Sequence, residues 1–572
     1  MIAPIVLASM AILGVGYFTY GRFLSRRLEL DDARVTPAVE VNDGVDYVPA
    51  KAQLLLGQHF SAIAAAGPIV GPILAGVWFG WVPAILWILL GSIFVGGVHD
   101  FASLVASVRH RASSIGEVVR AHMSPTSHVL FLIFVWFALV YVIIAFTDIT
   151  AQTFKTVAAD SAPGPGVAAG SILYLALGIF MGLLLRFTRL NLGLVTAIFL
   201  PLVLFSIWAG TQLPPSLVAS FLAMPVKSWE ALLLAYCFIA SLLPMWMLLQ
   251  PRGYLGGWFL YLTMAVALIG AIFGGFDIRY PAFNMDGLKS LENGRLLFPI
   301  VFITIACGAC SGFHGIVSSG TTSKQISRES DTRVIGYGAM LLEGLVAVLA
   351  LATVMALPKG DAALKGEPNF IFAQGIAGYL ARMGISYHLA LSFALLAFST
   401  FVYDTLDVCT RLARYILQEL LNWKSLLGGA VATFVTLLAP LAFLMATKEK
   451  GYLVAWPIFG TSNQLLASLT LLAISVWLLK TGRRAMYALI PMAFMLIVTL
   501  MALVLQIFPF LKLLPAWLAG NAVKADVVVS GICGIILLVL SVWLVIEAAR
   551  VLARAGAFSR LRRQVAEPVK AG

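Results

Sequence analysis

Long runs of apolar residues, separated by short segments that hold charges or clusters of Pro and Gly, follow one another along almost the whole chain. A helix needs about 20 such residues to cross a bilayer, whereas a transmembrane barrel would show short alternating segments. The pattern therefore predicts an all-α polytopic membrane protein with about 15 transmembrane spans. We place the spans at residues 1–21, 57–80, 83–108, 129–154, 168–186, 191–210, 230–250, 254–275, 297–318, 335–357, 388–413, 425–446, 453–479, 485–507 and 530–550.

The basic residues of the intervening loops are unevenly divided between the two sides of the membrane. When the loop after the first span is counted as cytoplasmic, roughly two thirds of all Lys and Arg residues fall on that side. This bias predicts an external N-terminus and a cytoplasmic C-terminus. The C-terminal stretch RVLARAGAFSRLRRQVAEPVK is then interpreted as an amphipathic end at the lipid surface.

Two of the predicted spans are poor helices. The second, LLLGQHFSAIAAAGPIVGPILAGVWFG, carries Pro68 and Pro72 near its middle, and each Pro removes a backbone donor that lipid cannot replace. The ninth includes GACSGFHGIVSSGTTSKQ, residues 308–325, which is rich in Gly and in hydroxyl side chains. Non-helical backbone survives at membrane depth only where protein covers it or water fills a cavity, so we expect both segments in the interior.

The two interrupted spans run in opposite directions by the loop charges, which indicates an inverted repeat. Each has a His before a run of small residues: His59 precedes Ala64–Gly67, and His314 precedes Ser318–Thr322. We therefore predict a LeuT-like core of two inverted five-helix repeats with additional helices. The predicted units are 1–56 (first span and cytoplasmic loop), 57–210 (repeat one), 211–296 (two inserted spans and an external loop), 297–480 (repeat two) and 481–572 (two C-terminal spans and the basic tail).

The meeting point of the two interrupted spans is the predicted substrate site, because broken helices offer free carbonyls and half-helix N-termini to a solute. Imidazole adds a group that titrates near neutrality, and hydroxyls add neutral donors where no intramembrane Lys is evident. Each of these side chains can also be an ordinary packing residue. The candidate substrate-binding residues are His59, Ser61, Gly67, Ser311, His314, Ser318, Ser319 and Thr321.

Ionisable side chains at membrane depth are rare and costly, so each one is a functional hypothesis. The candidates for proton or ion coupling are His99, Asp100, Asp148, Glu343, Ser399, Thr400, Asp404 and Asp407, the two hydroxyls being the sodium alternative. Asp407 has Arg411 four residues later, which predicts a structural ion pair. Asp404 and Glu343 have no evident partner in the sequence. The structural alternative is that these carboxylates only hold helices together, and that both hydroxyls bond to their own helix.

Composition narrows the function class further. Only 11% of the residues are charged, against roughly 25% in soluble domains, and the net charge of +12 is spread over loops that face lipid rather than nucleic acid. The chain has no G-x-x-x-x-G-K-[ST] loop for ATP, and its five Cys residues give no disulfide framework. Cys307, Cys310 and His314 share a helix face but lack a fourth ligand, so they are weak metal candidates and we expect no metal or cofactor.

Five motifs resemble one known family. In chain order they are GQHFSAIAAAGPIVGP, GGVHDFASLVASVRH, CSGFHGIVSSGTTSKQ, FVYDTLDVCTRLARYILQEL and PIFGTSNQLLASL. Together they make residues 1–480 similar to the carbon starvation protein A (CstA) family. The resemblance implies a secondary transporter of the bacterial cytoplasmic (inner) membrane, related to LeuT-type transporters. Family members are associated with uptake of peptides and of pyruvate, with proton coupling proposed.

These observations favour a transporter that imports pyruvate, or a similar small carboxylate, with protons under carbon limitation. A proton-coupled permease for short peptides is the alternative, because Asp100 or Asp404 would suit a peptide amine. A membrane enzyme would need a reactive constellation, and a channel would conduct without saturation; both are less favoured. The expected partners are the substrate, a proton or sodium ion, and the lipid bilayer, whereas the oligomeric state stays open.

Overall fold

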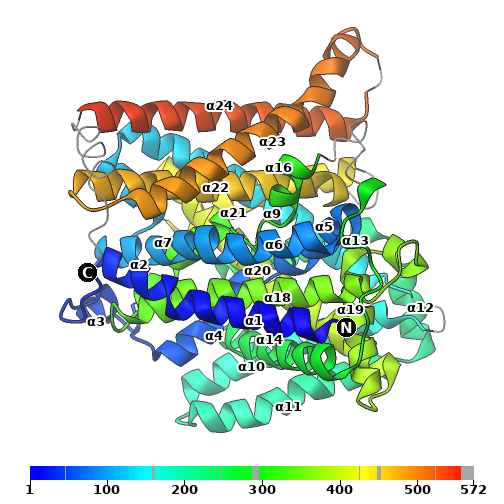
Figure 1. Ribbon diagram of the computed structural model, residues 1–572. Helices are drawn as coiled ribbons and strands as arrows, with labels where there is room; N and C mark the ends of the chain where they lie inside the picture. Colours follow the sequence, from blue (N-terminus) through cyan, green and yellow to red (C-terminus); the bar gives the residue numbers. More distant parts are fainter. Residues whose placement is uncertain are drawn as a thin grey trace.

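A computed structural model describes residues 1–44, 47–157, 161–244, 246–286, 296–423, 425–447, 452–521 and 523–554, and almost all of them lie in helices. The long helices lie side by side in one bundle (Figure 1). Within the described residues, twelve helices are long and apolar enough to cross a membrane, or up to 14 when each of two bent helix pairs counts as one span. The prediction of an all-α polytopic membrane protein is therefore confirmed.

The helices follow the order of the predicted spans. The first part of the chain forms α1 (Ala3–Phe18), α2 (Tyr20–Leu28), α3 (Pro37–Val41), α4 (Ala52–Ile63), α5 (Gly67–Phe79), α6 (Trp81–Gly91), the π-helical turn η1 (Ser92–Gly96), α7 (Gly97–Arg109), α8 (Ile115–His122), α9 (Pro125–Phe154), α10 (Pro163–Phe187), α11 (Leu192–Thr211), α12 (Pro215–Ala223), α13 (Val226–Leu242) and α14 (Leu249–Phe273). The second part forms α16 (Leu297–Thr304), α17 (Gly312–Gly320), η2 (Thr322–Gln325), the π-helical turn η3 (Arg333–Gly338), α18 (Ala339–Met355), η4 (Ala362–Lys365), α19 (Pro368–Arg382), α20 (Tyr387–Leu421), α21 (Leu426–Ala446), α22 (Tyr452–Lys480), α23 (Met486–Leu518) and α24 (Ala525–Arg554). Residues 555–572 of the predicted basic tail lie outside the described residues.

Both spans that the sequence marks as poor helices are interrupted. The second span bends by 50° between α4 and α5, at residues 64–66. The ninth span is divided into α16 and α17 by residues 305–311, so neither of its halves is long enough to count among the twelve. The break therefore comes before His314, and most of the run of small residues Ser318–Thr322 lies in α17 and η2.

The loop that follows α2 identifies one end of the bundle. We call residues 29–44 and 47–51 the strap, and the end of the bundle where it lies the strap end (left in Figure 1). The strap leads directly into α4, and its Ala50 N–H donates to the carbonyl of Gln325 at the end of η2 (3.0 Å). Thus α4 and α5 lead away from the strap end, whereas α16 and α17 lead toward it, as the opposite directions predicted for the two spans require.

Helix contacts recur in reciprocal pairs between the two predicted repeats. The first interrupted helix packs on α18 and the second packs on α7, which are the following helices of the opposite repeats. Likewise α10 packs on α20 while α21 packs on α9, and α11 packs on α20 while α22 packs on α9. In each case a contact from the first unit to the second has a counterpart from the second unit to the first. Two five-helix units related by a two-fold axis produce such paired contacts. The residue boundaries of the units stay predictions.

The two breaks cross each other closely. Gly67, at the start of α5, lies so near the second break that a Cβ atom there would overlap Cys307 Sγ and Cβ. One turn later, a Cβ atom on Gly71 would overlap the carbonyl oxygen of Thr304. Glycine at these two positions is therefore a packing requirement, since any side chain would force the interrupted helices apart.

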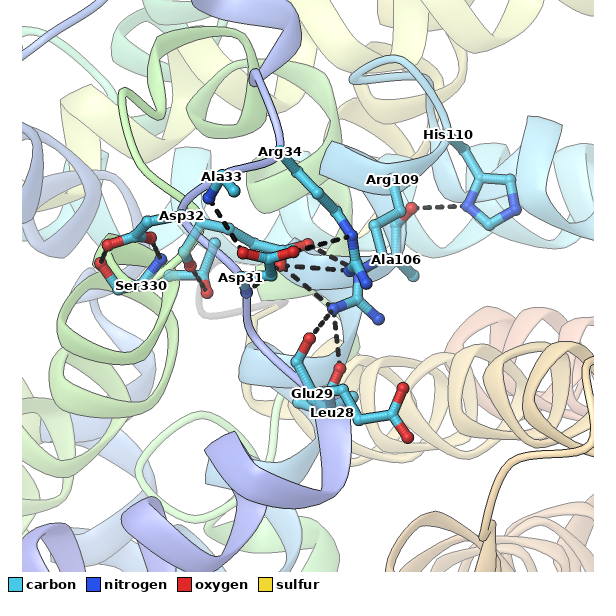
Figure 2. A network of polar contacts seen from close by, with 12 residues as sticks. Leu28, Glu29, Asp31, Asp32, Ala33, Arg34, Ala106, Arg109, His110 and Ser330 are labelled. Atoms are coloured by element: carbon cyan, nitrogen blue, oxygen red, sulfur yellow. Dashed lines mark hydrogen bonds and ion pairs between the residues drawn. The ribbon is translucent and has the colours of Figure 1, made fainter.

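A polar network holds the strap to the rest of the strap end (Figure 2). Glu329 is buried and accepts from Arg109 Nε (2.6 Å) and from the backbone N–H of Asp31 (2.7 Å). Arg109, the last residue of α7, also donates through Nη2 to the carbonyls of Leu28 and Glu29 (2.7 and 2.9 Å). Because Glu329 lies between η2 and η3, the network joins α2, the strap, α7 and the segment after the second interrupted helix.

Further hydrogen bonds connect the strap to the segment that follows η2. Asp32 accepts from the backbone N–H and from the hydroxyl of Ser330 (2.8 and 2.7 Å), as Figure 2 shows. Thr36 donates to the carbonyl of Ile326 (2.6 Å), and Ser327 donates to that of Ala50 (2.8 Å). The segment that follows the second interrupted helix is thus hydrogen-bonded to the strap at several positions.

We expect Glu329→Gln to destabilise the protein by about 3–5 kcal/mol, because it leaves the Arg109 guanidinium without its buried counter-charge. Thermal unfolding of the purified protein would show a lower midpoint, and hydrogen exchange would show faster opening of residues 28–36. The matched control is Glu117→Gln, which removes an ion pair with Arg120 that is exposed to solvent and should cost about 0–1 kcal/mol. Equal effects of the two variants would contradict the role of the network.

We expect Gly67→Ala to cost about 1–3 kcal/mol, because its methyl group has to displace Cys307 from a filled contact. The control is Gly14→Ala in α1, where an added Cβ meets nothing within 4 Å and the helix propensity of Ala is higher by up to about 1 kcal/mol. Thermal unfolding of both variants in the same detergent tests the difference. A Gly67→Ala protein as stable as the control would contradict the close crossing of the breaks.

Candidate functional site

The carbonyl groups that the second break frees are bound by side chains of other helices. Gln464 of α22 donates through Nε2 to the carbonyl of Phe302 (2.7 Å). Trp87 of α6 donates through Nε1 to the carbonyl of Ile305 (3.2 Å). These carbonyls at the end of α16 therefore do not face a solute, and the break is stabilised in a low-dielectric interior where unpaired carbonyls are costly.

The amide end of the same break is bound by the neighbouring side chain of α22. Asn463 accepts through Oδ1 from the backbone N–H of Phe313 (2.9 Å), in the first turn of α17, and donates through Nδ2 to Ser311 Oγ (3.0 Å). Asn463 Nδ2 also lies 3.4 Å from Cys307 Sγ. Asn463 and Gln464 thus bridge helices, the ordinary role of amide side chains inside a membrane.

Four titratable side chains meet beside this break, and we call them the relay: His99, Asp100, His314 and Glu343. Asp100 of α7 accepts from His99 Nδ1 and from His314 Nδ1, both at 2.7 Å. The second ring nitrogen of His314, Nε2, lies 3.2 Å from Glu343 Oε2 of α18. All four side chains are fully buried. The relay therefore connects the second interrupted helix to α7 and α18.

The geometry of the relay defines a place for one proton. Because Nδ1 of His314 donates to Asp100, only Nε2 is left to share a proton with Glu343. That proton resides either on Glu343, which then donates to His314, or on His314, which then faces a carboxylate. Glu343 makes no second ion pair within the described residues. A proton lost from this contact would thus leave a buried charge uncompensated, which is costly.

A second buried cluster lies on the other side of α4, around Arg252 in the first turn of α14. We call Arg252, Asp404 and Asp407 the triad. Arg252 Nε lies 2.7 Å from Asp404 Oδ1, and Arg252 Nη1 lies 2.6 Å from Asp407 Oδ2. Arg252 is fully buried, and both carboxylates of α20 are nearly so. The triad thus joins an inserted helix to repeat two.

Hydroxyl groups complete the triad. Ser61, in the last turn of α4, donates to Asp404 Oδ2 (2.8 Å). Tyr236 of α13 donates to Asp407 Oδ2 (2.7 Å) and also contacts Arg252 Nη1. Ser61 lies three residues before the first break, so the triad is connected directly to the first interrupted helix.

His59 lies between the two clusters. Its Nδ1 is hydrogen-bonded to Thr322 Oγ1 (2.8 Å), which links α4 to η2. A cavity of about 30 Å³ is lined by His59, Thr322, Asp404 and Gly253, among others. This volume holds about one water molecule. The cavity therefore lies between α4, η2, α14 and α20, with Asp404 of the triad in its wall.

The structure corrects three expectations about charged partners. Asp404, predicted to lack a partner, is paired with Arg252 and Ser61. Asp407 is paired with Arg252 instead of Arg411, because Arg411 donates through Nη2 to two backbone carbonyls after α13. Glu343 also has a partner, His314. In each case the partner comes from a helix distant in sequence.

The expected equivalence of His59 and His314 is wrong. His59 lies on α4, before the first break, whereas His314 lies on α17, after the second break. Because the two interrupted helices run in opposite directions, both residues lie on the halves nearer the strap end. An inverted repeat would instead relate α4 to α16 and α5 to α17, so the two His residues do not occupy equivalent positions.

Arg252 is the main residue that sequence reasoning missed. It follows Pro251 and precedes Gly253, and this Pro-Arg-Gly triplet has the composition of a loop between two spans. The structure starts α14 at Leu249, so Pro251 falls in the first helical turn, where Pro is tolerated. The available signal was a basic residue between two apolar runs with no other charge nearby.

The other candidates lie outside the relay and the triad. Ser319 and Thr321 donate to carbonyls of their own helix (2.8 and 3.0 Å). Asp148 accepts from Gln152 (3.2 Å), near the C-terminal end of α9. Ser399 is hydrogen-bonded to Ser171 of α10 (3.1 Å) and not to its own helix. The hydroxyls of Ser318 and Thr400 are buried and have no hydrogen-bond partner among the described residues.

The structure also bears on metal binding. Within the described residues, the group of three side chains close enough to share an ion is Glu117, His128 and Glu419, at the surface near α8. Cys307, Cys310 and His314 do not form such a group there, since both ring nitrogens of His314 face carboxylates.

Curated relatives of the chain are bacterial transporters. The peptide transporter CstA of Escherichia coli K12 is 34% identical, over 87% of this chain and 80% of that protein. The pyruvate/proton symporter BtsT of the same organism is 32% identical, over 88% and 81%. The peptide transporter CstA of Bacillus subtilis 168 is 31% identical, over 99% of both chains.

Solved structures align at lower similarity. The manganese transporter of Eremococcus coleocola aligns over 89% of this chain and 99% of its own, with a TM-score of 0.45 and 15% identity. MhsT in complex with L-phenylalanine aligns over 87% and 99%, with a TM-score of 0.45 and 13% identity. The sequence model of the family described as carbon starvation protein CstA matches residues 2–371 and 361–502. With relatives above 30% identity along most of its length, this chain belongs to the carbon starvation protein CstA family.

Proposed function

We propose that this protein is a secondary transporter that imports a small carboxylate, with pyruvate favoured, together with protons. The observation that carries the proposal is the relay, in which a buried proton position joins the second interrupted helix to α7 and α18. A relative named as a pyruvate/proton symporter supports the same substrate class.

The relay supports coupling because its proton is shared between two helices. When α17 moves relative to α18, the contact between His314 and Glu343 breaks. Separation then leaves a buried charge on one side unless a proton enters or leaves. The free energy of moving the interrupted helix therefore depends on whether the relay is protonated. A symporter requires this kind of coupling between a conformational change and proton binding.

The small size of the cavity beside α4 supports a transport cycle over an enzyme. It has room for about one water, so a solute as large as pyruvate fits there only after the surrounding helices move. At the strap end, the network around Glu329 has to open for release on that side. Alternating access by movement of one repeat against the other provides such an opening.

Transport of short peptides is the second candidate. Three of the relatives above 30% identity are named peptide transporters in different bacteria, and Asp404 is a carboxylate at the edge of the cavity that would suit a peptide amine. We further propose an inner-membrane location, with the N-terminus outside and the strap end on the cytoplasmic side, in keeping with the loop charges.

Uptake of labelled pyruvate into proteoliposomes tests the proposed function. We expect accumulation when the exterior is more acidic, loss of accumulation with a protonophore, and weak competition by dipeptides. If dipeptides drive exchange while pyruvate neither enters nor competes, the peptide function replaces the carboxylate function. Accumulation that follows a sodium gradient and ignores pH would favour Ser399 and Thr400 as coupling residues over the relay.

Removal of the relay proton gives a sharper prediction. We expect Glu343→Gln to reduce pH-driven pyruvate accumulation by about tenfold or more, because the transfer of a proton by a positioned side chain is lost. Exchange of internal for external pyruvate should persist, since it needs no net proton movement. The control is Glu419→Gln at the surface near α8. Normal pH-driven accumulation by Glu343→Gln would remove the relay from the mechanism.

A further inference from the structure

The triad holds two carboxylates for one guanidinium. Arg252 is paired with Asp404 and with Asp407, and within the described residues no other Lys or Arg forms an ion pair with either carboxylate. If both were ionised, the triad would carry one uncompensated negative charge away from water, which is costly. The arrangement therefore favours one proton on the pair of carboxyl groups.

The surroundings of the triad do not supply the missing positive charge. The other titratable groups that face it are Tyr174, Tyr236, Cys237, Tyr403 and Arg411. Arg411 directs Nη2 to the carbonyls of Ala240 and Leu243 (2.9 and 2.7 Å). His59 lines the cavity that Asp404 also lines, but its Nδ1 is engaged by Thr322.

The triad also keeps unused hydrogen-bonding capacity. Arg252 Nη2 and Asp407 Oδ1 are buried and have no hydrogen-bond partner among the described residues. An unsatisfied guanidinium nitrogen at full burial costs free energy unless the site has a second state that uses it. A carboxylate accepts two parallel hydrogen bonds from a guanidinium, so an incoming carboxylate group is a suitable ligand for Arg252.

Arg252 lies close enough to the small cavity for a ligand there to reach it. Asp404 and Gly253, the residue after Arg252, both line the small cavity beside the first break. Gly256, one turn further along α14, is so close to the triad that a Cβ atom there would overlap Asp404 Oδ2. Asp404 is thus the carboxylate of the triad that lies both against Arg252 and in the wall of the cavity.

We propose that Arg252 binds the carboxylate of the substrate by exchanging it for Asp404, which takes up one proton at binding. In this step the ion pair between Arg252 and Asp404 breaks, the substrate carboxylate pairs with Arg252, and one proton adds to the Asp404 carboxylate. The charge of the site is unchanged, since one anion and one proton enter together. This inference rests on the proposed carboxylate transport and deepens it by naming the binding residue and one proton that enters the binding site with each carboxylate, apart from the proton of the relay.

The exchange also connects binding to the first interrupted helix. Asp404 accepts from Ser61 at the end of α4, so release of Asp404 from Arg252 changes the contact nearest the first break. A zwitterionic dipeptide would behave differently, because its amine could pair with an ionised Asp404 while its carboxylate pairs with Arg252. No proton would then be needed for charge balance.

Binding of labelled pyruvate to the full-length protein in nanodiscs, measured at a series of pH values, tests the inference. For the wild type we expect the affinity to fall by about tenfold for each unit of rising pH, because one proton binds with each anion. Asp404→Asn should bind pyruvate with no pH dependence, since its amide carries no charge to exchange. Arg252→Gln should lose binding at every pH, and Arg382→Gln, an exposed Arg on α19, should match the wild type.

The outcomes separate this inference from the proposed function. An Asp404→Asn protein that keeps the wild-type pH slope overturns the exchange, even if Arg252→Gln fails to fold. A folded Arg252→Gln protein with wild-type affinity overturns the role of Arg252. If the wild type binds a dipeptide but no small carboxylate, the carboxylate function fails; dipeptide affinity that Arg252→Gln leaves unchanged then overturns the role of Arg252 as well.

Discussion

Charge balance away from water is the constraint on which the structure depends. Within the described part of the chain, the relay and the triad place buried carboxylates next to groups that can carry positive charge, because an isolated buried charge would cost several kcal/mol. The relay places Asp100 between two His residues, and the triad places Arg252 between two Asp residues. Each cluster holds two carboxylates and at most one permanently charged cation, so protonation of its side chains would reduce the charge that the packed helices bury.

The interrupted helices bring these clusters together. A continuous helix satisfies its own backbone groups, whereas a break leaves carbonyls and amides that lipid cannot bind. Here Gln464 and Trp87 bind the carbonyls of the second break, and Asn463 binds the amide end. The breaks can then cross at Gly67, with the relay next to α17 and the triad next to α4. The backbone groups at the second break are thus bound by other parts of the protein, and the titratable side chains lie beside the interrupted helices.

Much of this arrangement could be predicted from the chain itself. Apolar runs and loop lengths predicted the helices, and Pro68 and the glycines after residue 307 predicted which spans are interrupted. The intramembrane position of Asp100, Glu343 and Asp404 marked them as candidates, because charges are rare there. The pairs were not predictable: Glu343 with His314, or Asp404 with Arg252, joins residues on helices that only the packed bundle brings together. The loop-like surroundings of Arg252 concealed it for the same reason.

The sequence by itself determined the class of protein, the order of the spans and which two spans are interrupted, since hydropathy and Pro or Gly act locally along the chain. The tertiary structure alone decided which charge neutralises which, that both His59 and His314 lie toward the strap end, and that Asn463 and Gln464 bind the broken backbone. These outcomes depend on distances between separate helices. Such distances arise from side-chain packing across the bundle, and no local pattern of residues encodes them.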